Sequence, residues 1–172
     1  MASKIIDDDI FLKERVLFME EEFDEDSCNY LKKQLLWLMT HDEKKPVTIY
    51  ISSYGGDVYD FLQIYGLLKR KKFHLTTIAV GKCMSAGAYL LMMGDTRRAY
   101  PGSRIMFHEL TANSYGKLNE QEIDVKESKQ LMKILYNLCE EINMEDIEEW
   151  LQKDQYLSVK EALKINVLNK RL

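Results

Sequence analysis

Apolar and polar residues alternate along the chain with two different periods, and each change of period marks a new element. Leucines recur at helical spacing after an acidic stretch that ends in Asp26-Ser27, a pair that can cap a helix. Residues 47–51 alternate between apolar and polar, which predicts a strand. Two glycines end that strand, and a helical period resumes over residues 58–68. This first half therefore predicts helix, strand, turn and helix.

The middle of the chain repeats the same order. A second β-rich run covers residues 75–80, and we expect Gly81 to break it before a helix over 85–93. Residues 97–100 and 104–108 are two short strand candidates around a Pro-Gly turn. Strand and helix thus alternate twice, which predicts βαβ units, a mostly parallel sheet and an α/β fold.

The last third is dominated by one long helix. Its apolar positions fall mostly on one stripe between residues 120 and 142. Ser158 and Glu161 have the spacing of a capping box and predict a short final helix. With 172 residues, the chain fits a single domain spanning residues 1–172.

Composition and charge exclude several classes of protein. The net charge is −4, so nucleic acid is not the expected partner. No apolar run is long enough to span a membrane, and the acidic N-terminus does not resemble a signal peptide, so we expect a cytoplasmic protein. The cysteines, Cys28, Cys83 and Cys139, lack the number and spacing of a disulfide framework or a zinc site.

Two glycine-containing turns carry the first candidate chemistry. Gly55-Gly56 ends the first strand, and such a turn can expose backbone N–H groups to a developing oxyanion. Ser85 stands where the second strand turns into an apolar helix, which suits a nucleophile. Each motif alone is also explained by a plain strand-to-helix turn or by a helix-capping serine.

Two further residues could complete a catalytic set. His108 ends a strand just before a polar loop and is the best placed of the histidines to act as a base. Asp154 stands shortly before the capped final helix. Taken singly, His108 could equally be structural and Asp154 an ordinary surface acid.

Read together, the segments resemble the proteolytic subunit of the Clp protease, because the motifs follow the family's order over nearly the whole chain. The matching stretches are FLKERVLFM, DEDSCNYLKKQLLWL, ISSYGG, GKCMSAGAYLL, GSRIMFHEL and DQYLSVKEA. The resemblance implies a serine endopeptidase with Ser85 as nucleophile, His108 as general base and Asp154 as the orienting acid. It also implies an oxyanion hole made by the Gly55 and Ala86 N–H groups, and it requires no metal or cofactor.

The resemblance implies an architecture as well. We expect a crotonase-like α/β fold of stacked βαβ units, with a short leader over residues 1–10 and a protruding helix-strand handle over about 111–142. Seven subunits would form a ring, and two rings would stack through their handles into a homo-oligomeric tetradecamer. An ATP-driven unfoldase of the AAA+ class would feed polypeptides into that barrel.

Four other positions bear on these partners. The resemblance places Glu120 at the start of the handle helix and Lys153 before the catalytic acid, where they would meet across the ring–ring junction. Of two aromatic positions that help to dock the unfoldase, Tyr50 is kept, whereas Thr48 occupies the other.

Three alternatives remain open. A catalytically weak or inactive ring subunit would keep the fold without the activity. A crotonase-type acyl-CoA enzyme would use similar backbone N–H groups but would need no Ser-His-Asp set. A serine–lysine enzyme like the signal-peptide peptidases would normally bring a membrane anchor or a longer chain.

Overall fold

Seven helices and six strands are defined in the part of the chain that the structure describes. The structure is a computed structural model, and it describes residues 8–110, 118–143, 145 and 147–172. In chain order the elements are α1 (Asp8–Lys13), β1 (Val16–Met19), α2 (Glu25–His41), β2 (Val47–Ser53), α3 (Val58–Leu68), β3 (Leu75–Met84), α4 (Ala86–Met92), β4 (Thr96–Ala99), β5 (Arg104–Phe107), α5 (Leu118–Leu138), α6 (Ile147–Leu151), β6 (Gln155–Ser158) and α7 (Val159–Lys164).

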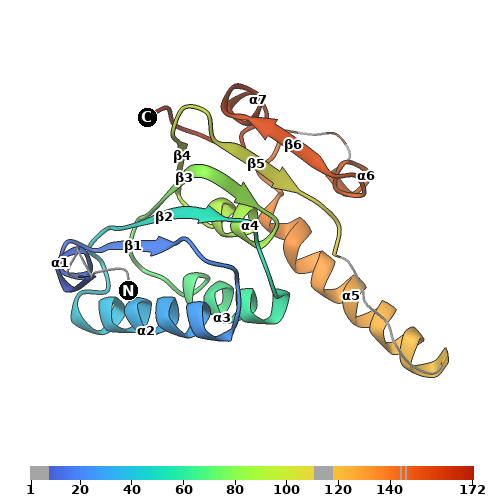
Figure 1. Cartoon of the computed structure of the whole chain (residues 1–172), viewed down its shortest axis with the longest axis horizontal. Helices are drawn as coiled ribbons and strands as arrows, with labels where there is room; N and C mark the ends of the chain where they lie inside the picture. The colour runs from blue at the N-terminus through green and yellow to red at the C-terminus, as the bar shows by residue number, and fades with distance from the viewer. Residues whose placement is uncertain (1–7, 111–117, 144, 146) are drawn as a thin grey trace, which may run out of the picture.

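The strands form one sheet in the order β1-β2-β3-β5-β6, and β4 also pairs with β3. All pairings are parallel except that between β5 and β6, which is antiparallel. Helices α2 and α3 lie side by side along one side of the sheet, and α4 packs against β3 (Figure 1). The predicted α/β class and its mostly parallel sheet are confirmed.

The helices begin at side chains that accept hydrogen bonds from their first turns. The N-cap of helix α2 is Asp24, two residues before the predicted Asp26-Ser27 pair, because Asp24 and Ser27 form a reciprocal capping box. Asp57 caps α3 by accepting from the Tyr59 and Asp60 N–H groups. The capping box predicted for α7, Ser158 with Glu161, is confirmed.

Strand β3 continues through Gly81, so the predicted break there is wrong. Gly81 adopts a positive φ of 71°, which glycine tolerates and which kinks the strand without ending it. Ser103 stabilises the kink, because its Oγ accepts from the Gly81 N–H at 3.1 Å and donates to the Ala79 carbonyl at 3.1 Å. Before the kink β3 pairs with β4, and after it with β5. The kink therefore carries β3 beyond β4 to reach the site.

Helix α5 projects away from the rest of the molecule (Figure 1). Its base packs against α4, and Met132 and Leu135 are buried in the core. Of the predicted handle region, residues 111–117 lie outside the described residues. No described helix has the length and apolar character to cross a membrane.

Candidate active site

Ser85 occupies a sharp turn between β3 and α4. Its backbone has φ 51° and ψ −123°, a conformation that non-glycine residues rarely adopt. The Ser85 N–H donates to the Met106 carbonyl at 2.8 Å, which ties the turn to β5. Such strain persists only where the surroundings enforce it, and it is common at active sites. The turn leaves the Ser85 side chain half-buried, without a capping bond to its own helix.

His108 is the first residue after β5, and its ring reaches Ser85. The distance from His108 Nε2 to Ser85 Oγ is 2.7 Å. When the ring proton is on Nδ1, the serine hydroxyl donates to Nε2 in this pair. The structure therefore brings together the predicted nucleophile and the predicted base at hydrogen-bonding distance. This geometry allows Nε2 to take the hydroxyl proton.

Asp154 lies across the β5–β6 ladder from His108 but does not bind it. The last residue pair of the antiparallel register is Phe107 with Gln155, so the next positions along the two chains are His108 and Asp154. Directly opposite residues on one face of such a ladder have Cβ atoms about 5 Å apart. Both residues belong to the described part of the chain, and no hydrogen bond joins them. Asp154 is exposed, whereas His108 is half-buried.

Gly55 packs directly against the serine. A Cβ at this position would lie 2.6 Å from the Ser85 Cβ and 3.1 Å from its Oγ, and φ is 108°. Both the space and the backbone conformation therefore require glycine. The Gly55 N–H donates to Ser53 Oγ at 3.1 Å, and this buried hydroxyl donates in turn to the Glu21 carbonyl at 2.6 Å. In this structure the predicted oxyanion donor is thus engaged within its own turn.

Two neighbouring N–H groups are not engaged in this way. Among the described residues, none accepts a hydrogen bond from the N–H of Gly56 or from that of Ala86, the first residue of α4. Gly56 has φ 148° and lies against the Phe23 backbone, where no side chain would fit. Ala86 follows Ser85 directly and is buried. The Gly55–Gly56 turn, which packs against Ser85 through Gly55, and the start of α4 therefore each carry one backbone N–H that could bind an anionic oxygen.

The predicted ring–ring contact is only partly visible. Lys153 is exposed and precedes Asp154 at the edge of the sheet. Glu120 lies in the first turn of α5, but its side chain is outside the described residues. Within the described ranges, no group of three or more His, Cys, Asp or Glu side chains is placed to hold a metal ion.

Two residues that contact the site were not found from the sequence. Ser53 anchors the Gly55 turn, and the Tyr89 hydroxyl donates to the His108 carbonyl at 3.1 Å. The sequence offered a signal for Tyr89, because a residue in the first turn of the helix that follows Ser85 lies close to the nucleophile turn. For Ser53 the signal was its place two residues before Gly55, since a serine hydroxyl often accepts from the N–H two residues on.

Comparison with known proteins identifies the family of the chain. The family model described as Clp protease matches residues 3–170. The chain belongs to the Clp protease family. It is 33% identical over 163 residues to the ATP-dependent Clp protease proteolytic subunit of Deinococcus radiodurans, covering 92% of this chain and 80% of the relative. It is 35% identical over 163 residues to proteolytic subunit 2 of Prochlorococcus marinus strain NATL2A, covering 91% and 82%.

Membership confirms the resemblance inferred from the ordered motifs. The match includes the strained turn at Ser85, the strand end at His108 and the edge segment with Asp154. A Clp protease domain acts in proteolysis, and the mixed α/β sheet described above is the fold of this family. The family thus provides the class of chemistry for which the Ser85–His108 geometry is suited.

Proposed function

We propose that this Clp protease family member is an active serine endopeptidase with Ser85 as its nucleophile. The observation that carries the proposal is the 2.7 Å distance between His108 Nε2 and Ser85 Oγ at a strained strand-to-helix turn. A serine hydroxyl is a weak nucleophile until an adjacent base takes its proton. An inactive ring subunit would have no need to keep this turn and this contact together.

The proposed reaction is acyl transfer to Ser85 followed by hydrolysis. His108 Nε2 takes the proton from Ser85 Oγ as the oxygen attacks the scissile carbonyl carbon. The imidazolium then gives that proton to the leaving amine, and the peptide bond breaks. A water molecule, deprotonated by the same ring, attacks the acyl-enzyme and releases the second product. Ser85 regains its proton, so no cofactor is consumed.

The carbonyl oxygen becomes negative in both steps and needs donors. The Ala86 N–H next to Ser85 is one candidate, as the family resemblance implies. On the other side of the serine, the Gly55–Gly56 turn supplies the second donor. Because the Gly55 N–H is bonded to Ser53 Oγ, we assign that donor to Gly56 in the geometry seen here; Gly55 would serve only after a rotation of its peptide plane.

We propose Asp154 as the acid that orients His108. The register places it opposite the base across β5 and β6, and the missing contact would form when the edge segment shifts. In the proposed tetradecamer of two stacked seven-membered rings, a contact between Lys153 and Glu120 of the opposite ring would fix this segment. Asp154 would then hold the Nδ1–H tautomer and stabilise the imidazolium.

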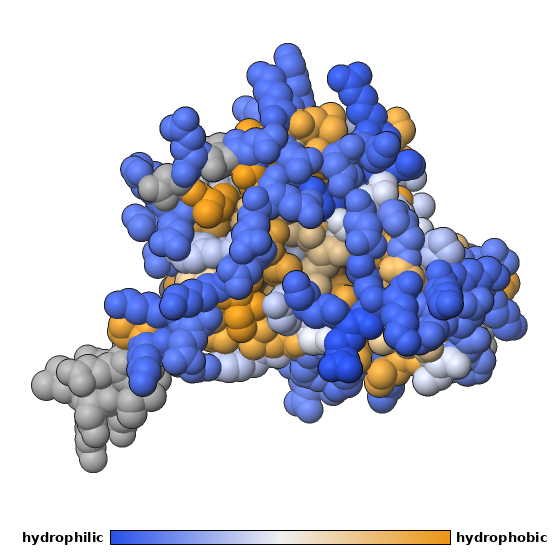
Figure 2. Space-filling model, turned by 180° about the vertical axis from the view of Figure 1, so that it is seen from behind, coloured by the Kyte–Doolittle hydropathy of each residue, from blue (hydrophilic) through white to orange (hydrophobic). Residues whose placement is uncertain are grey.

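Exposed apolar side chains support assembly into rings. On α2, Tyr30, Leu36 and Trp37 have 50%, 43% and 39% of their surface exposed. Seen from behind, the molecule also shows apolar residues near the middle of its face, between charged side chains (Figure 2). Apolar surface of this kind is common where subunits meet.

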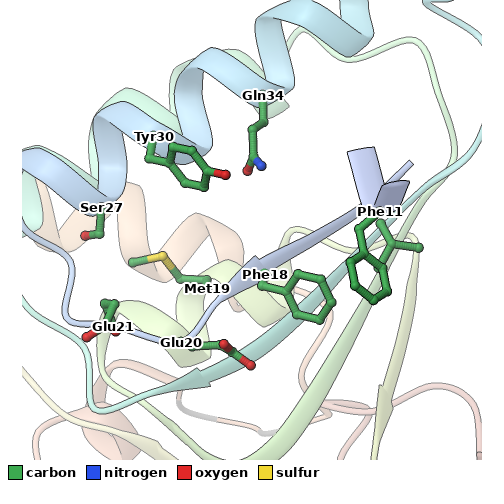
Figure 3. A pocket seen from close by; sticks show the side chains of 9 residues that line it. Phe11, Phe18, Met19, Glu20, Glu21, Ser27, Tyr30 and Gln34 are labelled. Atoms are coloured by element: carbon green, nitrogen blue, oxygen red, sulfur yellow. The ribbon is translucent and has the colours of Figure 1, made fainter. Parts of the chain in front are cut away.

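The surface formed by β1 and β2 is proposed as the docking site of the ATP-driven AAA+ unfoldase. Phe18 stacks on Tyr50 with ring centroids 5.6 Å apart, and Phe18 is 36% exposed. Beside them a pocket of about 230 Å³ opens between β1 and α2, and Tyr30 and Gln34 point into it from α2 (Figure 3). Gln34 Oε1 is buried without a hydrogen-bond partner in the described part of the chain. A backbone N–H of a docked peptide loop would satisfy that oxygen once the Gln34 side chain turned it toward the pocket.

The cellular location is proposed to be the cytoplasm. All three cysteines are buried and unpaired, which fits a reducing compartment. Membership of the Clp protease family speaks against the crotonase-type acyl-CoA enzyme considered from the sequence. The Ser85–His108 contact favours the peptidase, since thioester chemistry on backbone donors would not require it.

The direct test is hydrolysis by the assembled protein. We expect cleavage of short unstructured fluorogenic peptides and no cleavage of a stable folded protein, because a closed barrel admits small chains only. Adding the partner ATPase with ATP should permit degradation of a tagged folded protein, and Phe18→Ser should block only this second activity. An assembled protein that cleaves neither substrate would contradict the proposal and leave an inactive subunit as the better description.

A further inference from the structure

The position of His108 depends on few contacts, because it lies just beyond the end of β5. The β5–β6 ladder ends at Phe107, and Asp154 does not bind the histidine. Besides the contact between its ring and Ser85, two hydrogen bonds hold the backbone of this segment among the described residues: the Tyr89 hydroxyl donates to the His108 carbonyl at 3.1 Å, and the Leu110 N–H donates to Met132 Sδ at 3.4 Å. Of these, only the Tyr89 bond acts on His108 itself.

Tyr89 lies in the first turn of the helix that begins directly after the nucleophile. Helix α4 starts at Ala86, and the Tyr89 N–H donates to the Ser85 carbonyl at 3.1 Å. The Tyr89 ring is 2% exposed and meets the Phe107 ring edge-on, with centroids 5.5 Å apart. Tyr89 therefore contacts the last residue of β5 with its ring and the following residue with its hydroxyl.

Burial also keeps this hydroxyl a donor. Desolvation raises the pKa of Tyr89 far above its ordinary value, and the nearby Cys139 and Tyr136 raise it further. The hydroxyl remains protonated wherever the protein is folded, and it can donate to the carbonyl at every pH relevant to the reaction. A phenylalanine at this position would keep the ring contact and lose only this bond.

We infer that Tyr89 is a positioning residue for the proposed Ser85–His108 peptidase: its hydroxyl bonds the His108 backbone and thereby keeps the imidazole within reach of Ser85. The inference rests on the proposed function for its catalytic consequence. Its physical basis is that the group that bonds the base lies in the first turn of α4, and this turn is hydrogen-bonded to the carbonyl of the nucleophile residue. The separation between the two reacting side chains then depends on α4 and not on the exposed edge strand.

A purely structural role has to be separated from this one, because a buried tyrosine hydroxyl usually needs a partner in any case. The two roles differ in what the hydroxyl changes. If Tyr89 only fills the core, removing its oxygen alters stability and leaves the turnover of the folded protein unchanged. If it positions His108, the chemical step slows in a protein that still folds and assembles.

The test compares Tyr89→Phe with Tyr89→Leu and with Tyr65→Phe, a control on α3 away from the site. For Tyr89→Phe we expect kcat to fall about three- to tenfold, the range for loss of one hydrogen bond, with KM within about twofold of wild type. Labelling of Ser85 by a fluorophosphonate should slow by the same factor. Tyr65→Phe should match the wild type, and Tyr89→Leu should in addition lower the melting temperature.

Crystal structures of the wild type and Tyr89→Phe provide a readout that does not need activity. We expect the mean distance between His108 Nε2 and Ser85 Oγ to be longer in the variant, with His108 less well ordered. A variant with unchanged kcat, or one whose lower rate follows only from lost assembly, would overturn the inference. If the wild type proves inactive, the proposed function fails, and an unchanged His108 position in the variant would overturn the positioning role separately.

Discussion

The centre of the sheet and its C-terminal edge contribute different parts of the proposed catalytic set. Ser85 and His108 come from β3, α4 and β5 in the interior, where Ser85 is tied to Met106 and His108 is tied to Tyr89. Asp154 comes from the edge, before an antiparallel strand that has a neighbour on one side only. The interior pair is within hydrogen-bonding distance, whereas the edge acid is not bonded to its base.

This difference suggests how activity depends on assembly. Contacts within one subunit suffice to place the nucleophile beside its base. The proposed acid, Asp154, lies on an exposed segment, which a neighbouring subunit would contact in the proposed rings. We therefore expect loss of interior residues to abolish the reaction outright, and changes at the edge to act through the acid and through assembly.

The largest effect is expected for Ser85→Ala. Removing the nucleophile should lower peptide hydrolysis by at least about a thousandfold, as for other catalytic serines. Ser52→Ala is the matched control and should retain full activity, because Ser52 lies on the face of β2 opposite to Ser53, which anchors the Gly55 turn. The measurement is steady-state hydrolysis by rings whose assembly is verified by native mass spectrometry. Turnover near the wild-type rate in Ser85→Ala would refute the assignment of the interior pair.

The next effect is expected for Asp154→Asn. This variant should fold and assemble but lose about a hundredfold or more in kcat, because the amide can no longer fix the required His108 tautomer. Asp26→Asn on α2 is a charge-matched control. If Asp154→Asn retains wild-type kcat, the orienting acid is another residue and the proposed role of the edge is wrong.

A smaller effect is expected where the edge meets the opposite ring. Lys153→Glu should favour single rings and lower activity about tenfold, while stability changes little because an exposed ion pair contributes only about 0–1 kcal/mol. Adding Glu120→Lys should partly restore both properties. A double-mutant cycle read by sedimentation and peptidase rate measures the coupling. Additive effects, or a fully active double ring of Lys153→Glu, would show that the two charges do not interact.

The smallest expected effect is a difference in the alkylation rates of the buried cysteines. Burial raises the pKa of Cys28 to about 11, with Asp60 and other nearby acids adding to the shift, and burial raises that of Cys139 to about 12. The pKa of Cys83, beside the nucleophile turn, is also raised by burial. All three thiols should therefore be protonated at pH 8 and react slowly with iodoacetamide in the native protein.

The positions of Cys83 and Cys139 predict which of the two thiols is alkylated faster. Cys83 lies on β3, which is paired with β2 on one side and β5 on the other. Cys139 directly follows α5, at the base of this projecting helix. Alkylation followed by mass spectrometry should find Cys139 modified severalfold faster than Cys83, and both rates should rise with pH as thiolate forms. Faster modification of Cys83 would indicate that the centre of the sheet opens more readily than the base of α5.

Much of the fold could be predicted from local patterns in the sequence. The alternation of apolar and polar residues predicts β2, and the helical period of apolar residues predicts α3. The capping box that begins α7 is also formed by residues close in sequence. The continuation of β3 through Gly81 could not be predicted, because it depends on the hydroxyl of Ser103, which is distant in sequence. A glycine alone does not distinguish a strand end from a kink.

The candidate site shows the same division. Motif order pointed to Ser85 and His108, and their contact was an expectation that the geometry matches. The engagement of the Gly55 N–H by Ser53 depends on the exact path of the turn, and the bond from Tyr89 to His108 depends on how α4 packs against β5. Such contacts arise from tertiary packing, which residue spacing alone does not specify.

The most direct test of the account is covalent labelling of the assembled protein with a fluorophosphonate probe, followed by peptide mapping. An activated serine beside its base should react at one position, so the account predicts a single label on Ser85 that is lost in His108→Ala. Absence of label in intact rings, or label on a serine other than Ser85, would contradict the claim that His108 activates Ser85.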